Sequence, residues 1–286
     1  MKITDILNAK NVTVSCELFP PKAETPLAGA KKVIRNIASL NPSFMSVTYG
    51  AGGTTRENTV KIANEIQNVN GVTALAHLTC IGSDTPTIHA ILDALKAKNI
   101  TNILALRGDI PPGGCAPSQY RYASQLTEAI LRHGNFCVGG ACYPEGHPEA
   151  KSLQADIESL KIKVDAGCAF LTTQMFFDNN LLYNFMFRLL KNGVDVPVVA
   201  GIMPVINAKQ ITRICALSGT ALPPRFRAII DRFADHPAAM HQAGIAYATE
   251  QIIDLIANGV NHIHIYTMNK PDIAQRIMGN LSKIFR

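Results

Sequence analysis

The sequence has no run of about 20 apolar residues, which is the length that a membrane-spanning helix needs. It also has no leading apolar stretch of the signal-peptide type. These two absences predict a chain without a membrane partner, and we expect a cytoplasmic protein. An apolar fraction of 47% with 17% charged residues is typical of a chain that builds a globular core.

No CxxC pair occurs among the seven cysteines, and seven is an odd number. Several of them lie inside apolar runs, so we expect reduced thiols in the core of a protein in a reducing compartment. A metal site made by Cys80, Cys142 and His147 is disfavoured, because neither HExxH nor paired-cysteine spacing is present. We therefore expect no bound metal.

A concentrated basic patch is also lacking, although the net charge is +6, because the Lys and Arg residues are dispersed. This dispersal argues against nucleic-acid binding, whereas a mild positive balance suits anionic small molecules. The glycine-rich stretch at residues 50–55 fails the GxGxxG fingerprint at its last glycine, and no GK[ST] occurs. A dehydrogenase with directly bound nicotinamide is therefore disfavoured.

Apolar segments of strand length alternate with stretches whose apolar residues recur at helical spacing. Such alternation is typical of parallel strands joined by crossover helices. Eight units without a composition break favour an α/β fold, a (β/α)8 TIM barrel forming a single domain over residues 1–286. An open doubly wound sheet would show the same alternation. The expected strands cover residues 12–19, 44–49, 74–80, 102–106, 136–143, 170–177, 197–203 and 262–267, with at least two extra helices between strands 7 and 8.

Chemistry-bearing residues follow the expected strands at their C-terminal ends, where TIM barrels place their active sites. The strand at 102–106 shows this most clearly, because it runs directly into Arg107, Gly108 and Asp109. The set contains no Ser or Cys nucleophile beside a base, so it suits proton transfer and binding of a large, partly aromatic ligand. The other ends carry Glu17, Thr48, Tyr49, His77, Tyr143, His147, Gln174 and residues 267–270.

Several of these residues also have a structural interpretation. Glu17 lies in an apolar strand and fits either a functional carboxylate or a structural ion pair; we favour the first, because carboxylates are seldom buried without purpose. Asp109 fits a ligand-binding role, a loop cap or a pair with Arg107. His77 fits a ligand contact or a satisfied interior histidine. We interpret His262 and His264 as structural residues at the opposite mouth of the barrel.

Seven strings at these strand ends occur in the order of one known family. They are SCELFPPK at 15–22, SVTYGA at 46–51, HLTC at 77–80, LRGDIPPG at 106–113, YPEGHPEA at 143–150, QMFFD at 174–178 and GIMPV at 201–205. Together they resemble methylenetetrahydrofolate reductase of the bacterial, catalytic-domain-only type. Each string alone is a weak signal, whereas seven in register are specific.

The resemblance implies a barrel that holds FAD at the C-terminal ends of its strands. NADH or NADPH would reduce the flavin and leave before the folate enters. The implied FAD-binding residues are Thr48, Tyr49, Ala51, His77, Arg107, Gly108, Asp109, Ala123, Tyr143, His147, Ala150, Asp156 and Lys163. The implied folate-binding residues are Glu17, Asp109, Gln174, Gln210 and Lys270, with Glu17 and Asp109 as the catalytic pair.

The chemistry of the folate explains why an acid is needed. Its methylene bridge joins two nitrogens and accepts hydride poorly until one nitrogen is protonated. An acid against an apolar wall can keep its proton near neutral pH, and Glu17 between Cys16 and Leu18 fits that description. Asp109 beside the flavin would disfavour its anionic reduced form. A pterin-binding barrel without flavin is the alternative, and for either we expect a homo-oligomer.

Overall fold

Eight parallel strands close into a barrel in the order β1-β2-β3-β4-β5-β6-β7-β8. This computed structural model describes residues 1–9, 11–21, 27–49, 56–110 and 119–285. Closure of β8 onto β1, with Glu17 opposite Tyr266, confirms the (β/α)8 barrel and excludes an open sheet. The strands are β1 (Thr13–Leu18), β2 (Phe44–Val47), β3 (Ala74–Thr79), β4 (Asn102–Leu106), β5 (Cys137–Cys142), β6 (Phe170–Thr173), β7 (Val198–Ile202) and β8 (His262–Tyr266).

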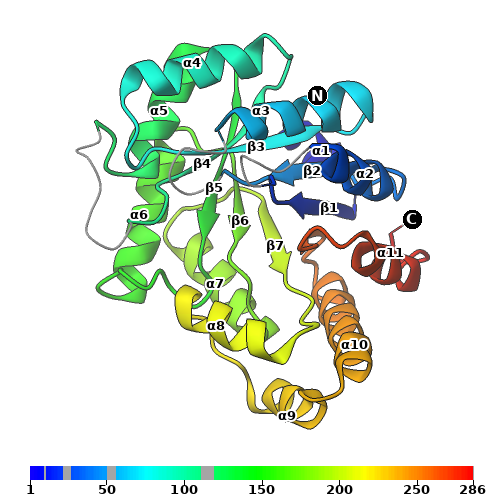
Figure 1. The fold of residues 1–286 in the computed structure, drawn as a ribbon. Coiled ribbons are helices and arrows are strands. Elements are labelled where there is room, and N and C mark those ends of the chain that lie inside the picture. Colours follow the sequence, from blue (N-terminus) through cyan, green and yellow to red (C-terminus); the bar gives the residue numbers. More distant parts are fainter. Residues whose placement is uncertain (10, 22–26, 50–55, 111–118, 286) are drawn as a thin grey trace.

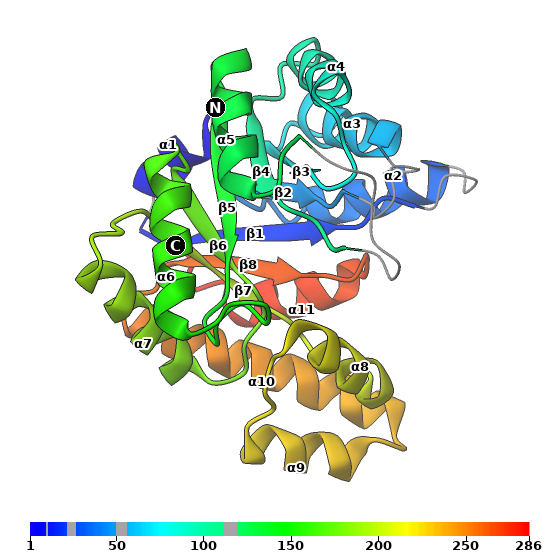
Figure 2. The ribbon, with the colours of Figure 1, turned by 90° about the vertical axis from the view of Figure 1, so that its left-hand side faces the viewer.

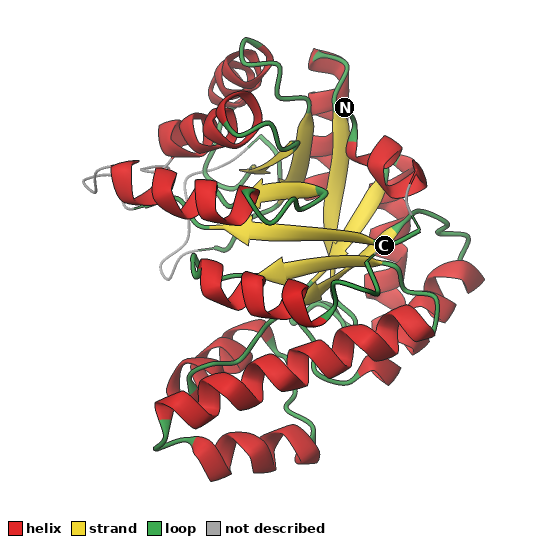
Figure 3. Cartoon of the chain, turned by 90° about the vertical axis from the view of Figure 1, so that its right-hand side faces the viewer, coloured by secondary structure: helices red, strands yellow, loops and turns green. Residues whose placement is uncertain are grey.

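Helices surround the strands on the outside, as Figures 1 and 3 show. Three of them lie between β7 and β8, where the sequence predicts at least two, and they extend from one side of the barrel (Figure 2). The helices are α1 (Ile3–Ala9), α2 (Leu27–Ala38), α3 (Arg56–Asn64), α4 (Thr85–Lys96), α5 (Ala123–His133), α6 (Leu153–Asp165), α7 (Asn179–Lys191), α8 (Ala208–Ser218), α9 (Pro224–Phe233), α10 (Pro237–Ala257) and α11 (Pro271–Asn280). A π-helix, η1 (Glu65–Val69), continues α3 and was not expected from the periodicity.

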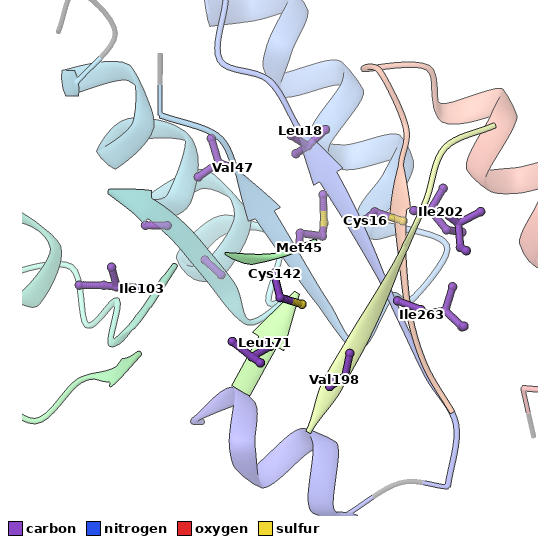
Figure 4. Close-up of a cluster of buried hydrophobic side chains, with 14 of the residues drawn as sticks. Cys16, Leu18, Met45, Val47, Ile103, Cys142, Leu171, Val198, Ile202 and Ile263 are labelled. Carbon is purple, nitrogen blue, oxygen red and sulfur yellow. The ribbon is translucent and has the colours of Figure 1, made fainter. Parts of the chain in front are cut away.

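Residues on both faces of the strands are buried, as the patterns of β1 and β7 show. Outward-facing side chains such as Leu18, Met45 and Ile263 pack against the surrounding helices (Figure 4). Inward-facing side chains at the N-terminal end form a separate apolar cluster that includes Phe44, Leu104 and, from α1, Ile6. The N-terminal mouth is therefore filled with apolar side chains.

Side chains of the connecting loops begin several of the outer helices. Asp84 accepts a hydrogen bond from the backbone N–H of Thr87 at the start of α4, and Ser152 does the same for Ala155 in α6. Such caps satisfy N–H groups that have no partner within the helix, and each contributes about 1 kcal/mol.

The described part of the chain contains no helix long and apolar enough to cross a membrane. Six of the cysteines lie in the described residues, where all six are buried free thiols, as expected. The seventh, Cys115, lies outside the described residues, as does Ala51 of the implied FAD set.

Candidate active site

Polar side chains occupy the barrel interior above the apolar cluster of its N-terminal end. Strand side chains alternate between the two faces, so Ser15 and Glu17 of β1 share the inner face. By the same alternation Ser46 follows Phe44 on β2, and His77 follows Leu75 on β3. All four polar side chains are buried. The interior therefore changes from apolar to polar toward the C-terminal mouth.

Glu17 is the buried carboxylate of this interior, with only 6% of the residue exposed. Its Oε2 accepts a hydrogen bond from Ser46 Oγ at 3.4 Å and lies 3.6 Å from Nε2 of both His77 and His264. The ion pairs in the described residues give it no Lys or Arg partner. A strong structural ion pair is therefore not the reason for a carboxylate at this position.

His77 faces the same interior with an imidazole that is neutral at pH 7. Burial lowers the pKa of His77 to about 4, although the nearby Glu17 opposes that shift. Its Nε2 has no hydrogen-bond partner among the described residues, and neither has the buried Oγ1 of Thr172 on β6. Buried polar atoms are nearly always hydrogen-bonded, so these two atoms indicate room for a polar ligand.

The backbone around Glu17 is held by the turn after β8. Thr267 Oγ1 donates to the carbonyl of Glu17 at 2.7 Å. The Asn269 side chain accepts from the N–H of Phe19 and donates to its carbonyl, both at 2.9 Å. Met268 and Asn269 have positive φ angles of 52° and 57°, which bring the Asn269 side chain back over β1. These bonds fix the backbone that carries the carboxylate.

Arg107, at the tip of β4, forms a bidentate ion pair with Glu149, with N–O distances of 2.5 and 2.6 Å. This pair raises the pKa of Arg107 and lowers the pKa of Glu149. Among the described residues the ion pair of Arg107 is with Glu149 and not with Asp109, although the charge of Asp109 still acts on it. Gly108 has a φ of +88°, and a Cβ there would lie 2.7 Å from Ile81 Cγ2, so glycine is required. Asp109 is exposed beyond this turn.

The loop after β5 carries two aromatic rings, and a carboxylate in the first turn of α6 bonds to its backbone. The rings of Tyr143 and His147 meet edge to face, with centroids 4.7 Å apart. The backbone N–H of His147 donates to Asp156 Oδ2 at 3.1 Å, and burial raises the pKa of Asp156. Burial raises the pKa of Tyr143, and the negative charge of Asp109 raises it further. The Tyr143 hydroxyl and the Asp109 carboxylate therefore interact electrostatically.

Lys163 of α6 reaches back across β5, where its Nζ donates to the carbonyl of Ala141 at 2.6 Å. Burial lowers the pKa of Lys163. The side chain can lie there because residue 140 is glycine, whose Cβ would stand 2.6 Å from Lys163 Cδ. This cation is thus placed at the strand ends rather than in solvent.

The remaining expected site residues lie at the C-terminal end of the barrel, after strands or at the starts of helices. Gln174 follows β6, and its Oε1 accepts from the N–H of Met175 at 2.9 Å. No hydrogen bond or ion pair in the described residues joins Gln210 of α8 or Lys270, which precedes α11, to Glu17. Thr48 and Tyr49 are half-buried after β2, Ala123 is buried at the start of α5, and Ala150 is half-buried before α6.

One sequence interpretation is corrected by the barrel register. His264 does not lie at the opposite mouth; it pairs with Ser15, is 2% exposed and approaches Glu17. His262 does lie at that N-terminal end, where its Nδ1 and Thr13 Oγ1 are 3.0 Å apart. Alternation along β8 is the signal that could have found His264, since it shares the inner face with Tyr266.

Comparison with known proteins agrees with this geometry. The family model described as methylenetetrahydrofolate reductase matches residues 2–282. The 5,10-methylenetetrahydrofolate reductase of Escherichia coli (strain K12) is 36% identical over 270 residues, 94% of this chain and 90% of that protein. The enzyme of the same name from Pectobacterium carotovorum subsp. carotovorum is 35% identical over 270 residues, with the same two coverages of 94% and 90%.

A solved structure has the same fold. It is an uncharacterized protein from Clostridium thermocellum that binds two copies of 5-methyl-5,6,7,8-tetrahydrofolic acid, with a TM-score of 0.69 and 12% sequence identity. The match covers 99% of this chain and 100% of that one, and at this identity it supports the fold alone. The family match over nearly the whole chain and the two bacterial relatives also show the family to which the chain belongs. The chain therefore belongs to the methylenetetrahydrofolate reductase family, whose members are flavin-dependent oxidoreductases that reduce methylenetetrahydrofolate.

Proposed function

We propose that this chain binds FAD at the C-terminal mouth of its barrel and takes electrons from NADH. It then reduces 5,10-methylenetetrahydrofolate to 5-methyltetrahydrofolate. The observation that supports this most directly is the buried Glu17, whose Oε2 is approached by Ser46, His77 and His264 and which faces the polar end of the barrel. A carboxyl group in that setting suits an acid that gives a proton to a bound substrate.

The residues of the mouth fit a large cofactor that has both aromatic and anionic parts. His77 Nε2 and Thr172 Oγ1 are buried polar atoms that lack partners among the described residues. Lys163 supplies positive charge at the tip of β5, which suits a diphosphate, whereas the charge of Arg107 at the tip of β4 is shared with Glu149. The residues that would hold FAD are Thr48, Tyr49, Ala51, His77, Arg107, Gly108, Asp109, Ala123, Tyr143, His147, Ala150, Asp156 and Lys163. When bound, FAD supplies the hydride chemistry of both half-reactions, so that the nicotinamide and the folate can use the same position in turn.

Glu17 acts on the folate. Its carboxyl proton passes to a nitrogen of the methylene bridge, which opens the bridge to an iminium that accepts hydride readily. The neutral His77 beside it adds no positive charge that would hold the carboxylate form before the folate arrives. After the transfer, Glu17 is a carboxylate next to Ser46, which already donates toward its Oε2.

The other polar tips orient the folate. Asp109 offers carboxylate oxygens to N–H groups of the pterin, and Gln174 offers a donor and an acceptor on one amide. Gln210 is exposed on the first turn of α8 and suits a contact farther along the ligand. Lys270 is exposed before α11 and supplies positive charge for the anionic tail of the folate.

An absorption spectrum of the purified protein tests the proposal. We expect a flavin spectrum that NADH bleaches without oxygen and that 5,10-methylenetetrahydrofolate then restores. A colourless protein that cannot be loaded with FAD would refute flavin chemistry, and folate binding by such a protein would favour the pterin-binding alternative. A flavin that NADH reduces but the folate cannot reoxidise would refute the substrate.

A further inference from the structure

The inward-facing side chains of the barrel lie in layers, and alternate strands contribute to each layer. Two contacts that reach over an intervening strand show this arrangement. Glu17 Oε2 of β1 lies 3.6 Å from His77 Nε2 of β3, and Ser46 Oγ of β2 lies 3.2 Å from His264 Nε2 of β8. The strand pairings complete the upper layer from β5 and β7, and the lower one from β4 and β6. The upper layer consists of Glu17, His77, Ala141 and Gly201, and the lower layer of Ser46, Leu104, Thr172 and His264.

The upper layer has large side chains on one side of the barrel only. Glu17 and His77 come from β1 and β3, whereas β5 and β7 contribute an alanine and a glycine. Tyr266 covers the glycine, since a Cβ on Gly201 would lie 2.5 Å from the Tyr266 hydroxyl oxygen. Ala141 stays partly exposed, although it lies on the inner face of β5. The side of β5 is therefore where this layer has the least side-chain volume.

Thr172 lies in the layer directly beneath that side. It pairs with Ala141 in the parallel ladder between β5 and β6. It faces the interior because it alternates with Phe170 of the inner apolar cluster, while Leu171 packs on the outside. Thr172 is 6% exposed, and its Oγ1 has no hydrogen-bond partner among the described residues. Because enclosed hydroxyls are nearly always hydrogen-bonded, this one indicates a ligand or a water beside Ala141.

The place of Thr172 on its strand indicates which ligand reaches it. Gln174 follows two residues later, about 7 Å nearer the C-terminal mouth on the same face. The backbone N–H of Gln174 still donates to the carbonyl of Cys142 at 2.7 Å, so the strand geometry continues to this residue. The two side chains thus place a hydroxyl and an amide along one wall, and each group can donate and accept. The pterin ring of a folate carries nitrogens, an amino group and a carbonyl, which suit such a wall.

We propose that Thr172 is a further folate-contact residue, whose hydroxyl binds the polar edge of the pterin directly or through one water. This inference rests on the proposed function and adds a residue that determines affinity rather than one that moves a proton. A hydroxyl that finds its partner only on the ligand also gives specificity. A ring without polar atoms at that edge would leave the hydroxyl unsatisfied and would bind less tightly.

The variant Thr172→Val tests this role, because valine keeps the shape of threonine and lacks the hydroxyl. Titration of the FAD-loaded protein with 5-methyltetrahydrofolate, followed by flavin absorption, gives a dissociation constant without turnover. We expect Thr172→Val to raise this constant at least about fivefold and to change the affinity for FAD and the NADH half-reaction less than about twofold. Thr172→Ser, which retains a hydroxyl, should come within about twofold of wild type.

The matched control is Thr13→Val, at the other end of the barrel. Thr13 is also buried, but its Oγ1 lies 3.0 Å from His262 Nδ1 and so has a partner within the protein. Thr13→Val should lower the urea midpoint of the folate-free holoenzyme and leave its affinity for 5-methyltetrahydrofolate as in wild type. Thr172→Val should do the reverse: it should keep the midpoint and lose the affinity.

Rapid mixing with 5,10-methylenetetrahydrofolate separates binding from chemistry. In Thr172→Val the apparent dissociation constant should rise by a larger factor than the limiting rate falls, as expected for a residue that binds and does not react.

Three results would overturn the proposal. They are a wild-type folate affinity in Thr172→Val, an affinity in Thr172→Ser as weak as in Thr172→Val, and a urea midpoint in Thr172→Val as low as in Thr13→Val. The last would show that the hydroxyl already has a partner in the folate-free protein. If wild-type holoenzyme binds no 5-methyltetrahydrofolate, the proposed function fails and this inference with it. Wild-type binding together with an unchanged Thr172→Val overturns this inference alone.

Discussion

Replacing Glu17 by glutamine keeps the size of the side chain but removes its acidic group. The side chain is 6% exposed, so the amide occupies the same enclosed space, and its oxygen can still accept from Ser46. An acid that protonates the folate typically contributes about 10² to 10⁴ in rate. We therefore expect the folate half-reaction to slow by about that factor, equal to about 2.7 to 5.5 kcal/mol of barrier. The NADH half-reaction should be unchanged, because no step in it uses the Glu17 proton.

Anaerobic stopped-flow absorption measures the two half-reactions separately. A matched control is Glu65→Gln, since Glu65 is also a buried carboxylate but pairs with Lys31 at 3.1 Å. That variant should keep both rates. Loss of both half-reactions in Glu17→Gln would show that Glu17 is structural, and a folate rate within about twofold of wild type would refute its role as the acid.

Three further changes test the surroundings. Asp109→Asn should slow the folate half-reaction and raise the flavin potential, because a negative charge near the ring disfavours the reduced anion; a potential equal to that of wild type would contradict this argument. The pKa of His77 is lowered from 6.5 to about 4. Between these two pH values, His77 takes up a proton in the unfolded chain but stays neutral in the folded chain. Wild type should therefore lose on the order of 3 kcal/mol of unfolding free energy as the pH falls through this range. His77→Gln should lose less in urea titrations, and equal losses would refute the assignment. Asn269→Ala removes two hydrogen bonds to Phe19 and should lower the unfolding free energy by about 1–3 kcal/mol. Asn280→Ala, at an exposed site, should change the unfolding free energy less, and equal changes would contradict a stabilising role for the Asn269 bonds to Phe19.

Most of the fold could be predicted because its signal is local. A buried parallel strand is a short apolar run, and an outer helix shows a stripe at a 3.6-residue period, so both can be recognised in one sequence. The π-helix at the end of α3 carries no such signature. Closure of the barrel depends on pairing between β1 and β8, and the hydrogen bond from Thr267 to Glu17 joins residues 250 positions apart in the chain. No local pattern reports a contact over that separation.

The site was only partly predictable for the same reason. The strand ends indicated Glu17, His77 and Arg107, because the C-terminal ends of parallel strands meet. The partners of these residues depend on register, which periodicity does not reveal. His264 was therefore assigned to the wrong mouth, and Glu149 was not identified as the partner of Arg107. The single domain over 1–286, the homo-oligomer and the cytoplasmic location stay predictions.

A crystal structure with FAD and the folate bound would test the central claim most directly. We expect the flavin ring at the C-terminal mouth, beside His77 and Asp109, with the folate stacked on it. A nitrogen of the folate bridge should lie within hydrogen-bond reach of the Glu17 carboxyl group, about 3 Å away or through one water. A flavin or folate bound elsewhere, with Glu17 facing neither, would contradict the account.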